Sequence, residues 1–242
     1  MRRTNINLII VIFLGLTSNN IFSDMACIEE EDHSWNKINS KVTFINNKYG
    51  STSYLITNDS RVKIKRMLNS EITDFDKIVK LRRNYGPDKL FDSNKSTAWV
   101  EGVEGFGFNE GVIFFVEPNI ESIEILNGFT RTKELFEDNN RIKEINIEIF
   151  TALPDTVTQC GAVFLLDKIN TKKYELIDSM DFQKIDIIIP DNTLKEVTKK
   201  YKDISDELWR KKRLVIGLSI ISVYKGNKYD DSCISEIKLN YK

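Results

Sequence analysis

Three glutamates, Glu101, Glu104 and Glu110, flank a glycine-rich stretch and could supply the paired carboxyl groups of a glycoside hydrolase. That chemistry needs two carboxyl groups about 5 to 9.5 Å apart across a cleft. A chain with 36 acidic residues offers many such pairs, so their presence alone carries little weight. Serine and cysteine nucleophiles have no suitable base, because the one histidine, His33, lies outside the region that contains them. The sequence therefore predicts a protein that is not an enzyme.

A second group of side chains has the chemistry of sugar recognition. Sugar hydroxyl groups are bound by planar side chains with several hydrogen-bonding atoms, beside an aromatic face. The candidates are Trp99, Glu101, Asn127, Asn139 and Arg141, with Phe106 or Phe108 as further aromatic platforms. Trp99 stands where a strand begins, so a core position is its alternative. For Arg141 we favour a buried ion pair with Glu101 or Glu110 over direct ligand contact.

These candidates lie among short β-branched runs separated by Gly, Asn and Asp, a pattern typical of an antiparallel sandwich or jelly roll. The predicted strands span residues 97–100, 111–116, 122–126, 144–150, 162–168, 186–189, 214–223 and 235–241. Eight strands suit two packed sheets. A chain of 242 residues with 41% hydrophobic side chains can enclose a substantial core. The fold class is therefore mostly β, with a sandwich over residues 86–242.

Residues 24–85 predict a small α+β segment before the sandwich. Alternating side chains predict strands over 41–45 and 53–56, and helical spacing predicts a helix over 72–82 with Thr73 or Asp74 as its N-cap. We interpret the intervening basic residues as the solvated face of a strand; they are Arg61, Lys63, Lys65 and Arg66. The charged stretch 191–212 predicts a short helix or a long loop over a sheet edge.

Five elements follow one another in order along the predicted sandwich. They are Thr97-Ala98-Trp99 with Glu101-Gly102, a glycine stretch ending in Glu110, Asn127-Gly128, Asn139-Asn140-Arg141 with Lys143, and Tyr224 to Ile237 with Gly226 and Asp230. Together they resemble the galactose-binding-like jelly rolls called discoidin or coagulation-factor type C domains. The most similar subgroup is the translocation domain of streptococcal NAD glycohydrolase. The resemblance covers residues 86–242 and leaves 24–85 unmatched.

The resemblance also implies a calcium site. In related carbohydrate-binding modules, the matching positions supply hard oxygen ligands from a turn and a strand. Here these positions are Asp92, Thr97 and Glu236, with Asn94 as a weaker extra ligand. Ser93 replaces the usual glycine, and Lys95 places an ammonium group beside the turn. The alternative is a metal-free turn in which Asp92 caps local amides and Glu236 pairs with Lys95.

The N-terminus predicts export. Two arginines precede an apolar run of about eleven residues, too short to span a bilayer as a helix but typical of a secretory signal. Cleavage after Ser23 would remove residues 1–23, whereas Met25-Ala26-Cys27 resembles a lipoprotein box with Cys27 as the lipidated residue. Lipidation of Cys27 would leave Cys160 and Cys233 as a possible pair. We expect the exported protein in the periplasm, on the outer membrane as a lipoprotein, or outside the cell. The only contact with a membrane that we expect is the lipid anchor on Cys27.

Charge excludes one class of partner. With 35 basic and 36 acidic residues the chain has no global positive field, so nucleic acid is not an expected ligand. The predicted function is an exported, non-catalytic binding module for a glycan or another cell-envelope or host-surface component. The alternative is a structural or protein-docking module without a sugar site.

Overall fold

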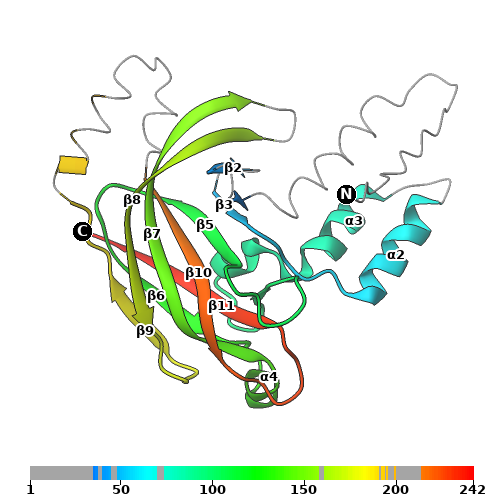
Figure 1. Cartoon of the computed structure of the whole chain (residues 1–242). Helices are drawn as coiled ribbons and strands as arrows, with labels where there is room; N and C mark the ends of the chain where they lie inside the picture. Colours follow the sequence, from blue (N-terminus) through cyan, green and yellow to red (C-terminus); the bar gives the residue numbers. More distant parts are fainter. Residues whose placement is uncertain are drawn as a thin grey trace, which may run out of the picture.

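The computed structural model describes residues 35–37, 40–44, 48–69, 74–157, 161–190, 192, 193, 195, 199 and 214–242. Its eleven strands form one hydrogen-bonded network, folded into two sheets that pack face to face (Figure 1). One sheet has the order β1-β2-β8-β7-β10-β5-β3, and the other has the order β9-β6-β11-β4. The two are joined where Ser232 and Cys233 pair in parallel with Asn140 and Arg141. The predicted mostly-β sandwich is confirmed.

The strands and helices have the following bounds. The first sheet contains β1 (Trp35–Asn36), β2 (Lys41–Phe44), β3 (Tyr49–Ser51), β5 (Gly111–Val116), β7 (Asn140–Val157), β8 (Ala162–Glu175) and β10 (Leu214–Tyr224). The second contains β4 (Trp99–Val100), β6 (Ile120–Asn127), β9 (Phe182–Asp186) and β11 (Ser232–Tyr241). The helices are α2 (Asn58–Leu68), α3 (Phe75–Arg82), η2 (Arg83–Tyr85), η3 (Pro87–Phe91) and α4 (Lys133–Asp138).

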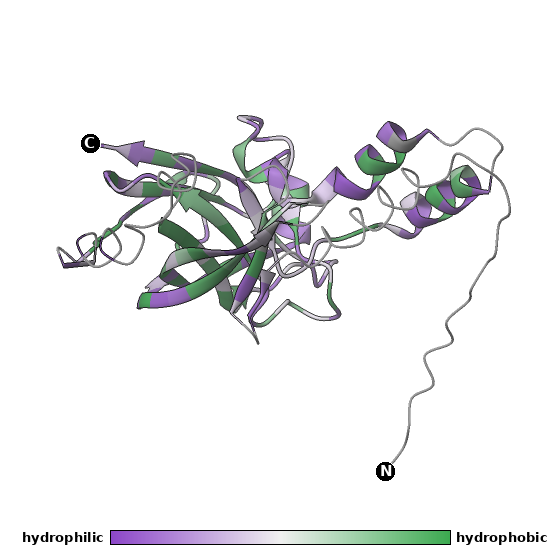
Figure 2. Cartoon of the chain, turned by 90° about the horizontal axis from the view of Figure 1, so that it is seen from above, coloured by the Kyte–Doolittle hydropathy of each residue, from purple (hydrophilic) through white to green (hydrophobic). Residues whose placement is uncertain are grey.

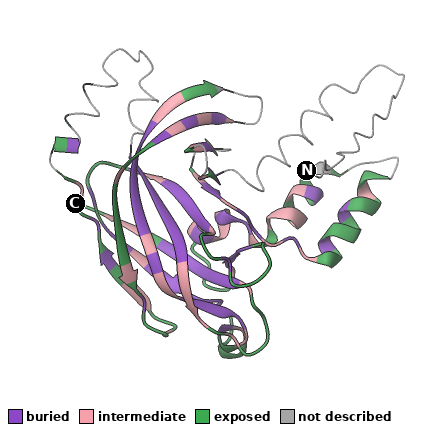
Figure 3. Ribbon diagram, viewed as in Figure 1, coloured by how far each residue is buried: buried purple, intermediate pink, exposed green. Residues whose placement is uncertain are grey.

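Alternation along the strands builds the core between the two sheets. On β7, Ile145, Ile147 and Ile149 point into this core, while Asn146 and Glu148 lie on the opposite face of the same sheet. Strands β6, β10 and β11 contribute facing aliphatic side chains, which are buried along the middle of the sandwich (Figure 3). Because the isoleucines of β7 fill the core, the polar side chains in the middle of this strand lie on the outer face of the sheet.

The first three strands belong to the sandwich rather than to a segment of their own. β2 pairs with β8, and β3 pairs with β5. Trp35 and Phe44 cover the outer face of the sheet in a second apolar cluster with Phe150 and Phe164. The sheet thus extends beyond the boundary at residue 86 that the sequence suggested, because sheet pairing joins segments far apart in the chain.

Two predictions for this early region need correction. The basic residues read as a strand face lie on α2, whose N-cap Thr57 accepts a hydrogen bond from the Ser60 backbone N–H at 3.2 Å. The strand predicted over 53–56 lies instead at Tyr49–Ser51. By contrast, α3 is confirmed with Asp74 as its N-cap. Figures 1 and 2 show both helices beside the sandwich rather than over either sheet.

Within the sandwich, the predicted strand at Gly111–Val116 matches the observed one in full, and β9 lies at Phe182–Asp186 rather than 186–189. Gly111 is required where β5 meets β10, since a Cβ there would lie 1.9 Å from the Leu218 carbonyl oxygen. Most of residues 191–212 lies outside the described residues.

Candidate functional site

Trp99, predicted as an aromatic platform for a sugar, is part of the core. Its side chain is 0% exposed and packs in the cluster between the sheets. The indole Nε1–H donates a 3.0 Å hydrogen bond to the Ser53 carbonyl oxygen. A fully enclosed ring cannot stack on a ligand, so the core alternative holds for Trp99.

Asn127 and Asn139 also serve the scaffold. Asn127 lies at the end of β6, where its Nδ2 donates to the Ile142 carbonyl at 2.7 Å and its Oδ1 accepts from the Ile142 N–H at 2.9 Å. The Asn127 side chain thus satisfies both backbone hydrogen-bonding groups of Ile142, near the start of β7. Asn139 ends helix α4, and its Nδ2 donates to the Leu135 carbonyl at 2.8 Å. Both side chains are buried and have their amide donors committed to backbone oxygens.

Arg141 is a structural ion-pair partner, but with a different carboxylate from the predicted ones. Its Nε and Nη2 donate to the two carboxylate oxygens of Asp178 at 3.0 and 2.8 Å, a bidentate pair. Nη1 donates to the carbonyls of Asn139 and Lys225 at 3.0 and 3.1 Å. The predicted pairing with Glu101 or Glu110 is therefore wrong, because Asp178, 37 residues away, lies nearer in the fold.

The predicted glycosidase carboxylates do not face a common cleft. Glu101 is 0% exposed and accepts hydrogen bonds from the backbone N–H groups of Val103 and Ser232, at 2.8 and 3.3 Å. Burial raises the pKa of Glu101 to about 7. Glu110 lies on another surface, where Thr52 Oγ1 donates to its carboxylate at 2.5 Å, and Glu104 is exposed. Glu101 is a buried structural acid, not a group that substrate can reach.

Glu101 is expected to make stability depend on pH. Its pKa is raised from 4.5 to about 7, so the folded state keeps a proton that the unfolded state loses between these values. The free energy of unfolding should therefore fall as pH rises through this window. Urea denaturation at pH 5 and pH 8 measures this fall, which should be about 2 kcal/mol larger for the wild type than for Glu101→Gln.

The control for this experiment is Glu104→Gln, which removes an exposed carboxylate from the same loop. It should retain the wild-type pH profile. Parallel pH profiles for the wild type and Glu101→Gln would show that Glu101 does not carry the buried proton.

The turn before Trp99 brings oxygen atoms of Asp92, Asn94 and Thr97 close together. Thr97 Oγ1 lies 2.9 Å from Asp92 Oδ2 and 2.8 Å from the Asn94 carbonyl oxygen. One hydroxyl proton cannot satisfy both acceptors, so oxygen atoms outnumber donors at this point. Asp92 Oδ1 also accepts from the Asn94 backbone N–H at 2.9 Å. Ser93, in place of the usual glycine, adopts a positive φ of 59°.

Glu236 approaches this turn from β11. Its carboxylate oxygen Oε2 is buried and has no hydrogen-bond partner. Burial raises the pKa of Glu236 and the charge of Asp92 adds to this effect, while hydrogen bonds from the backbone N–H groups of Ser93 and Asn94 oppose it. Of the predicted metal-free alternative, the capping of a local amide by Asp92 is present. The ion pair between Glu236 and Lys95 is not, since the Lys95 ammonium lies over the Phe182 ring, 5.2 Å from its centroid. An unpartnered carboxylate oxygen beside other oxygens fits a hard cation such as calcium.

Only two carboxylates take part in this turn. Across the described part of the chain, no group of three or more His, Cys, Asp or Glu side chains gathers as a metal site. A cation here would therefore depend on the Thr97 hydroxyl and on backbone carbonyl oxygens in addition to Asp92 and Glu236.

The N-terminal predictions fall on residues 1–34, outside the described residues, and this includes the signal 1–23 and the lipidation candidate Cys27. Cys233 is a buried free thiol. Its possible partner Cys160 lies outside the described residues. None of the described helices has the length and apolar character to cross a membrane.

A polar concavity lies elsewhere, on the outer face of the first sheet beneath β1. Its volume is about 680 Å³. Six separate parts of the chain line it: β1 with the residue after it, the residue after β3, the loop before β5, and strands β7, β8 and β10. The lining residues are Trp35, Asn36, Lys37, Thr52, Asn109, Glu110, Asn146, Glu148, Lys168 and Ser219. We call this cavity the sheet-face pocket.

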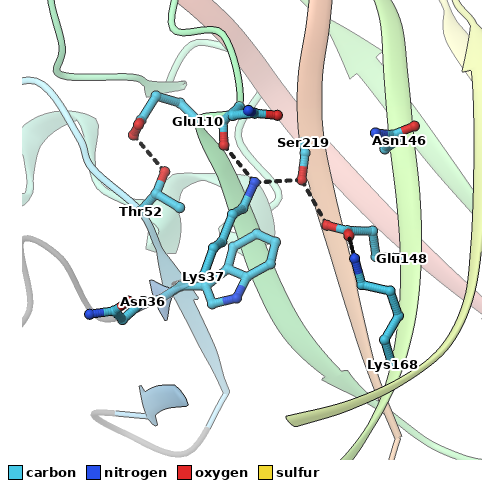
Figure 4. A pocket seen from close by; sticks show the side chains of 10 residues that line it. Asn36, Lys37, Thr52, Glu110, Asn146, Glu148, Lys168 and Ser219 are labelled. Carbon is cyan, nitrogen blue, oxygen red and sulfur yellow. Dashed lines mark hydrogen bonds and ion pairs between the residues drawn. The ribbon is translucent and has the colours of Figure 1, made fainter. Parts of the chain in front are cut away.

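A chain of hydrogen bonds crosses the sheet-face pocket (Figure 4). Lys37 Nζ donates to the Asn109 carbonyl at 2.5 Å and to Ser219 Oγ at 2.7 Å. Ser219 Oγ donates in turn to Glu148 Oε2 at 3.0 Å, and Lys168 pairs with the other oxygen of Glu148. Glu148 and Ser219 are only 8% and 2% exposed. The polar floor of the pocket is therefore fixed by internal bonds.

Lys37 is the group whose protonation the sheet-face pocket perturbs most. Burial lowers the pKa of Lys37 to about 8, and the charges of Glu148 and Glu110 oppose this shift. The ammonium also lies over the Trp35 ring, 4.4 Å from its centroid. A concave site with converging polar groups and a perturbed lysine is a general mark of a ligand-binding site.

The sheet-face pocket balances its own charges. Lys37 and Lys168 bring two positive charges, and Glu110 and Glu148 bring two negative ones. The amides of Asn36 and Asn146 add both donors and acceptors. Such a surface suits a neutral ligand with many hydroxyl groups, because a charged ligand would leave one of the two signs without compensation.

Of the residues that line the sheet-face pocket, sequence reasoning singled out only Glu110, as a catalytic carboxylate or a partner of Arg141. Trp35, Asn36 and Lys37 fall in the segment that the resemblance left unmatched. A signal was present on β7, where Glu144, Asn146 and Glu148 alternate with isoleucines and so mark a polar outer face in the middle of a wide sheet.

Comparison with known proteins gives one family and several distant folds. The description of that family is "NAD glycohydrolase translocation F5/8 type C domain", and the match covers residues 76–240. None of the curated proteins matches the chain significantly. The family match confirms the resemblance carried by the five sequence elements.

Solved structures resemble the chain only loosely. One is the arabinofuranosyltransferase AftD from Mycobacteria, with a TM-score of 0.42 and 8% identity over 84% of this chain and 11% of that one. Another is the C-terminal domain of a chitobiase from Bacteroides fragilis, with a TM-score of 0.39 and 14% identity over 83% and 97%. A third is the module CpGH89CBM32-4 from Clostridium perfringens, at 0.30 and 11% over 65% and 83%. The chain thus spans about a tenth of the arabinofuranosyltransferase.

Proposed function

Because this chain belongs to the family of NAD glycohydrolase translocation F5/8 type C domains, we propose that it is an exported, non-catalytic binding module. Its ligand is a neutral glycan of the cell envelope or of a host surface, bound in the sheet-face pocket. The observation that carries this proposal is the charge-balanced set of donors and acceptors that line a concavity of about 680 Å³.

The chemistry of a sugar hydroxyl supports this assignment. Each hydroxyl both donates and accepts, and the sheet-face pocket places donors of Lys37 and Lys168 beside acceptors of Glu110 and Glu148. Ser219 and Glu148 are already held in place, so a ligand would meet a preformed surface and lose little affinity to ordering. The short apolar run after Arg2 and Arg3 supports export.

Two observations favour binding over catalysis. Glu101 is buried, and Glu110 is held by hydroxyl groups of Thr52 and Ser53.

A glycan array with the wild-type protein tests the ligand class, with a free sugar as competitor. The Asn146→Ala variant should weaken binding to the positive glycan about tenfold, since it removes amide hydrogen bonds worth about 1.4 kcal/mol in total. The matched control is Lys173→Ala, on the same face of the sheet but outside the sheet-face pocket, where Lys173 pairs with Glu144. It should change affinity less than twofold.

The runner-up function, a structural or protein-docking module, makes the opposite forecast. A docking module should bind no glycan on the array, and its partner should not be displaced by free sugar. Binding that survives both Asn146→Ala and Glu148→Gln would contradict the sheet-face pocket as the site.

We also propose that the turn of Asp92 and Thr97, closed by Glu236, holds a structural calcium ion. A cation bound only by the folded state stabilises it by about 2.7 kcal/mol at a hundredfold excess over Kd. For a chain of this size that corresponds to a rise in Tm of about 5 to 10 °C. Differential scanning fluorimetry in EDTA and in millimolar calcium measures it, with magnesium at equal ionic strength as the control.

The variant Glu236→Gln should lose most of the calcium-dependent rise in Tm. An unchanged wild-type Tm between EDTA and calcium would show that this turn is metal-free.

A further inference from the structure

A second cavity opens at the end of the sandwich where β4, β7 and β11 begin, and it shares no lining residue with the sheet-face pocket. Its volume is about 260 Å³. Three aromatic residues, Tyr85, Phe129 and Tyr229, line it together with the carboxylate residue Asp231. We call it the aromatic pocket.

The aromatic side chains form walls of different orientation. The rings of Tyr85 and Phe129 stand nearly perpendicular, at 82° with centroids 6.3 Å apart. Tyr229 is 40% exposed and lies at the rim, whereas Val100 and Leu135 make apolar contacts further in. Aromatic faces attract cations through their negative quadrupole, and more strongly where water is excluded.

Asp231 is the charged residue among those that line the aromatic pocket, and the Lys228 ammonium lies at the rim over the Tyr229 ring, 5.0 Å from its centroid. Among the described residues, no lysine or arginine forms an ion pair with Asp231, while the neighbouring Asp230 faces Lys225 at 3.9 Å. Burial and the charge of Asp230 raise the pKa of Asp231. The charge of Asp231 also adds to the effect of burial in raising the pKa of Glu101. A positive charge placed here would relieve these repulsions.

We propose that the aromatic pocket binds an organic ammonium group. The charge of the ligand pairs with Asp231, and its methyl or methylene groups pack on Tyr85 and Phe129. A neutral hydroxyl ligand could bond to the same carboxylate, but it would leave the negative charge uncompensated. This site is independent of the glycan assignment, since it uses other residues on another part of the fold.

Isothermal titration calorimetry with choline tests the charge requirement. The matched neutral probe is 3,3-dimethylbutanol, which has the shape of choline without its charge. The wild type should bind choline at least tenfold more tightly than the neutral probe, and Asp231→Asn should remove that preference. Asp230→Asn, adjacent in sequence but outside the pocket, is the control and should keep it.

A second variant tests the aromatic pocket at an exposed residue, where a substitution should not affect folding. Tyr229→Ala removes an exposed ring at the rim and should weaken choline binding severalfold while leaving Tm unchanged. Equal binding of both probes, no choline binding by the wild type, or an equal effect of Asp230→Asn and Asp231→Asn would overturn the proposal.

Two sources of the ammonium group are separated by a further probe. Nα-acetyl-lysine methylamide represents a lysine side chain of a partner protein, and choline represents a quaternary ammonium headgroup. Preference for the lysine probe would assign the aromatic pocket to a protein partner. Binding to either should persist in Asn146→Ala, so failure of the glycan assignment would leave this result intact.

Discussion

Replacing Arg141 with alanine is expected to lower the free energy of unfolding by about 2 to 4 kcal/mol. The variant loses the bidentate pair with Asp178 and leaves the carbonyls of Asn139 and Lys225 without their donor. Asp178 is about a third exposed and can be rehydrated, which keeps the loss below that of a fully buried pair. Urea denaturation measures the change.

The matched control is Lys225→Ala, since the exposed side chain of Lys225 pairs with Asp230 only at 3.9 Å. This variant should stay within about 0.5 kcal/mol of the wild type. Arg141→Lys should recover only part of the loss, because an ammonium group cannot reproduce the planar fork. A wild-type Tm for Arg141→Ala would return Arg141 to the candidate ligand-binding residues.

Replacing Trp99 with alanine should have an equal or larger effect, about 3 to 5 kcal/mol. The indole is fully buried between the sheets and donates to the Ser53 carbonyl, so the variant leaves both a cavity and an unpaired carbonyl oxygen. Many native domains have a total stability of only about 5 to 15 kcal/mol, so the variant is expected to be partly unfolded at 37 °C. Circular dichroism during heating measures this.

Trp99→Phe separates packing from hydrogen bonding. It keeps most of the buried ring and should cost about 1 to 2 kcal/mol, largely for the unpaired Ser53 carbonyl. If Trp99 were instead an open sugar platform, alanine would leave Tm unchanged and abolish glycan binding.

Local patterns were sufficient where a structure is decided by neighbours in sequence. The β-branched run at Gly111–Val116 is a strand with the predicted bounds. Asp74 caps α3 as predicted, because a cap acts on amides only two or three residues away. The ordered motifs from Thr97 to Ile237 also identified the family, which the match over residues 76–240 confirms.

Local patterns failed where burial or a partner depends on the whole fold. The basic side chains of α2 were predicted to lie on the polar face of a strand, because a surface helix and a surface strand both expose one polar face to water. Arg141 was correctly favoured as a structural residue, but its carboxylate partner came from the β8–β9 connection, which no spacing rule links to the start of β7.

The sequence by itself determined the mostly-β fold class, the strand at Gly111–Val116, helix α3 with its cap, the family, and the types of side chain available for chemistry. The tertiary structure decided which of those side chains face a ligand. Asn127 and Arg141 donate to backbone carbonyls and to Asp178, whereas Lys37, Asn146 and Ser219 meet from three separate segments to form the sheet-face pocket. The physical reason is that pairing between distant strands sets burial, and burial determines which polar groups remain available.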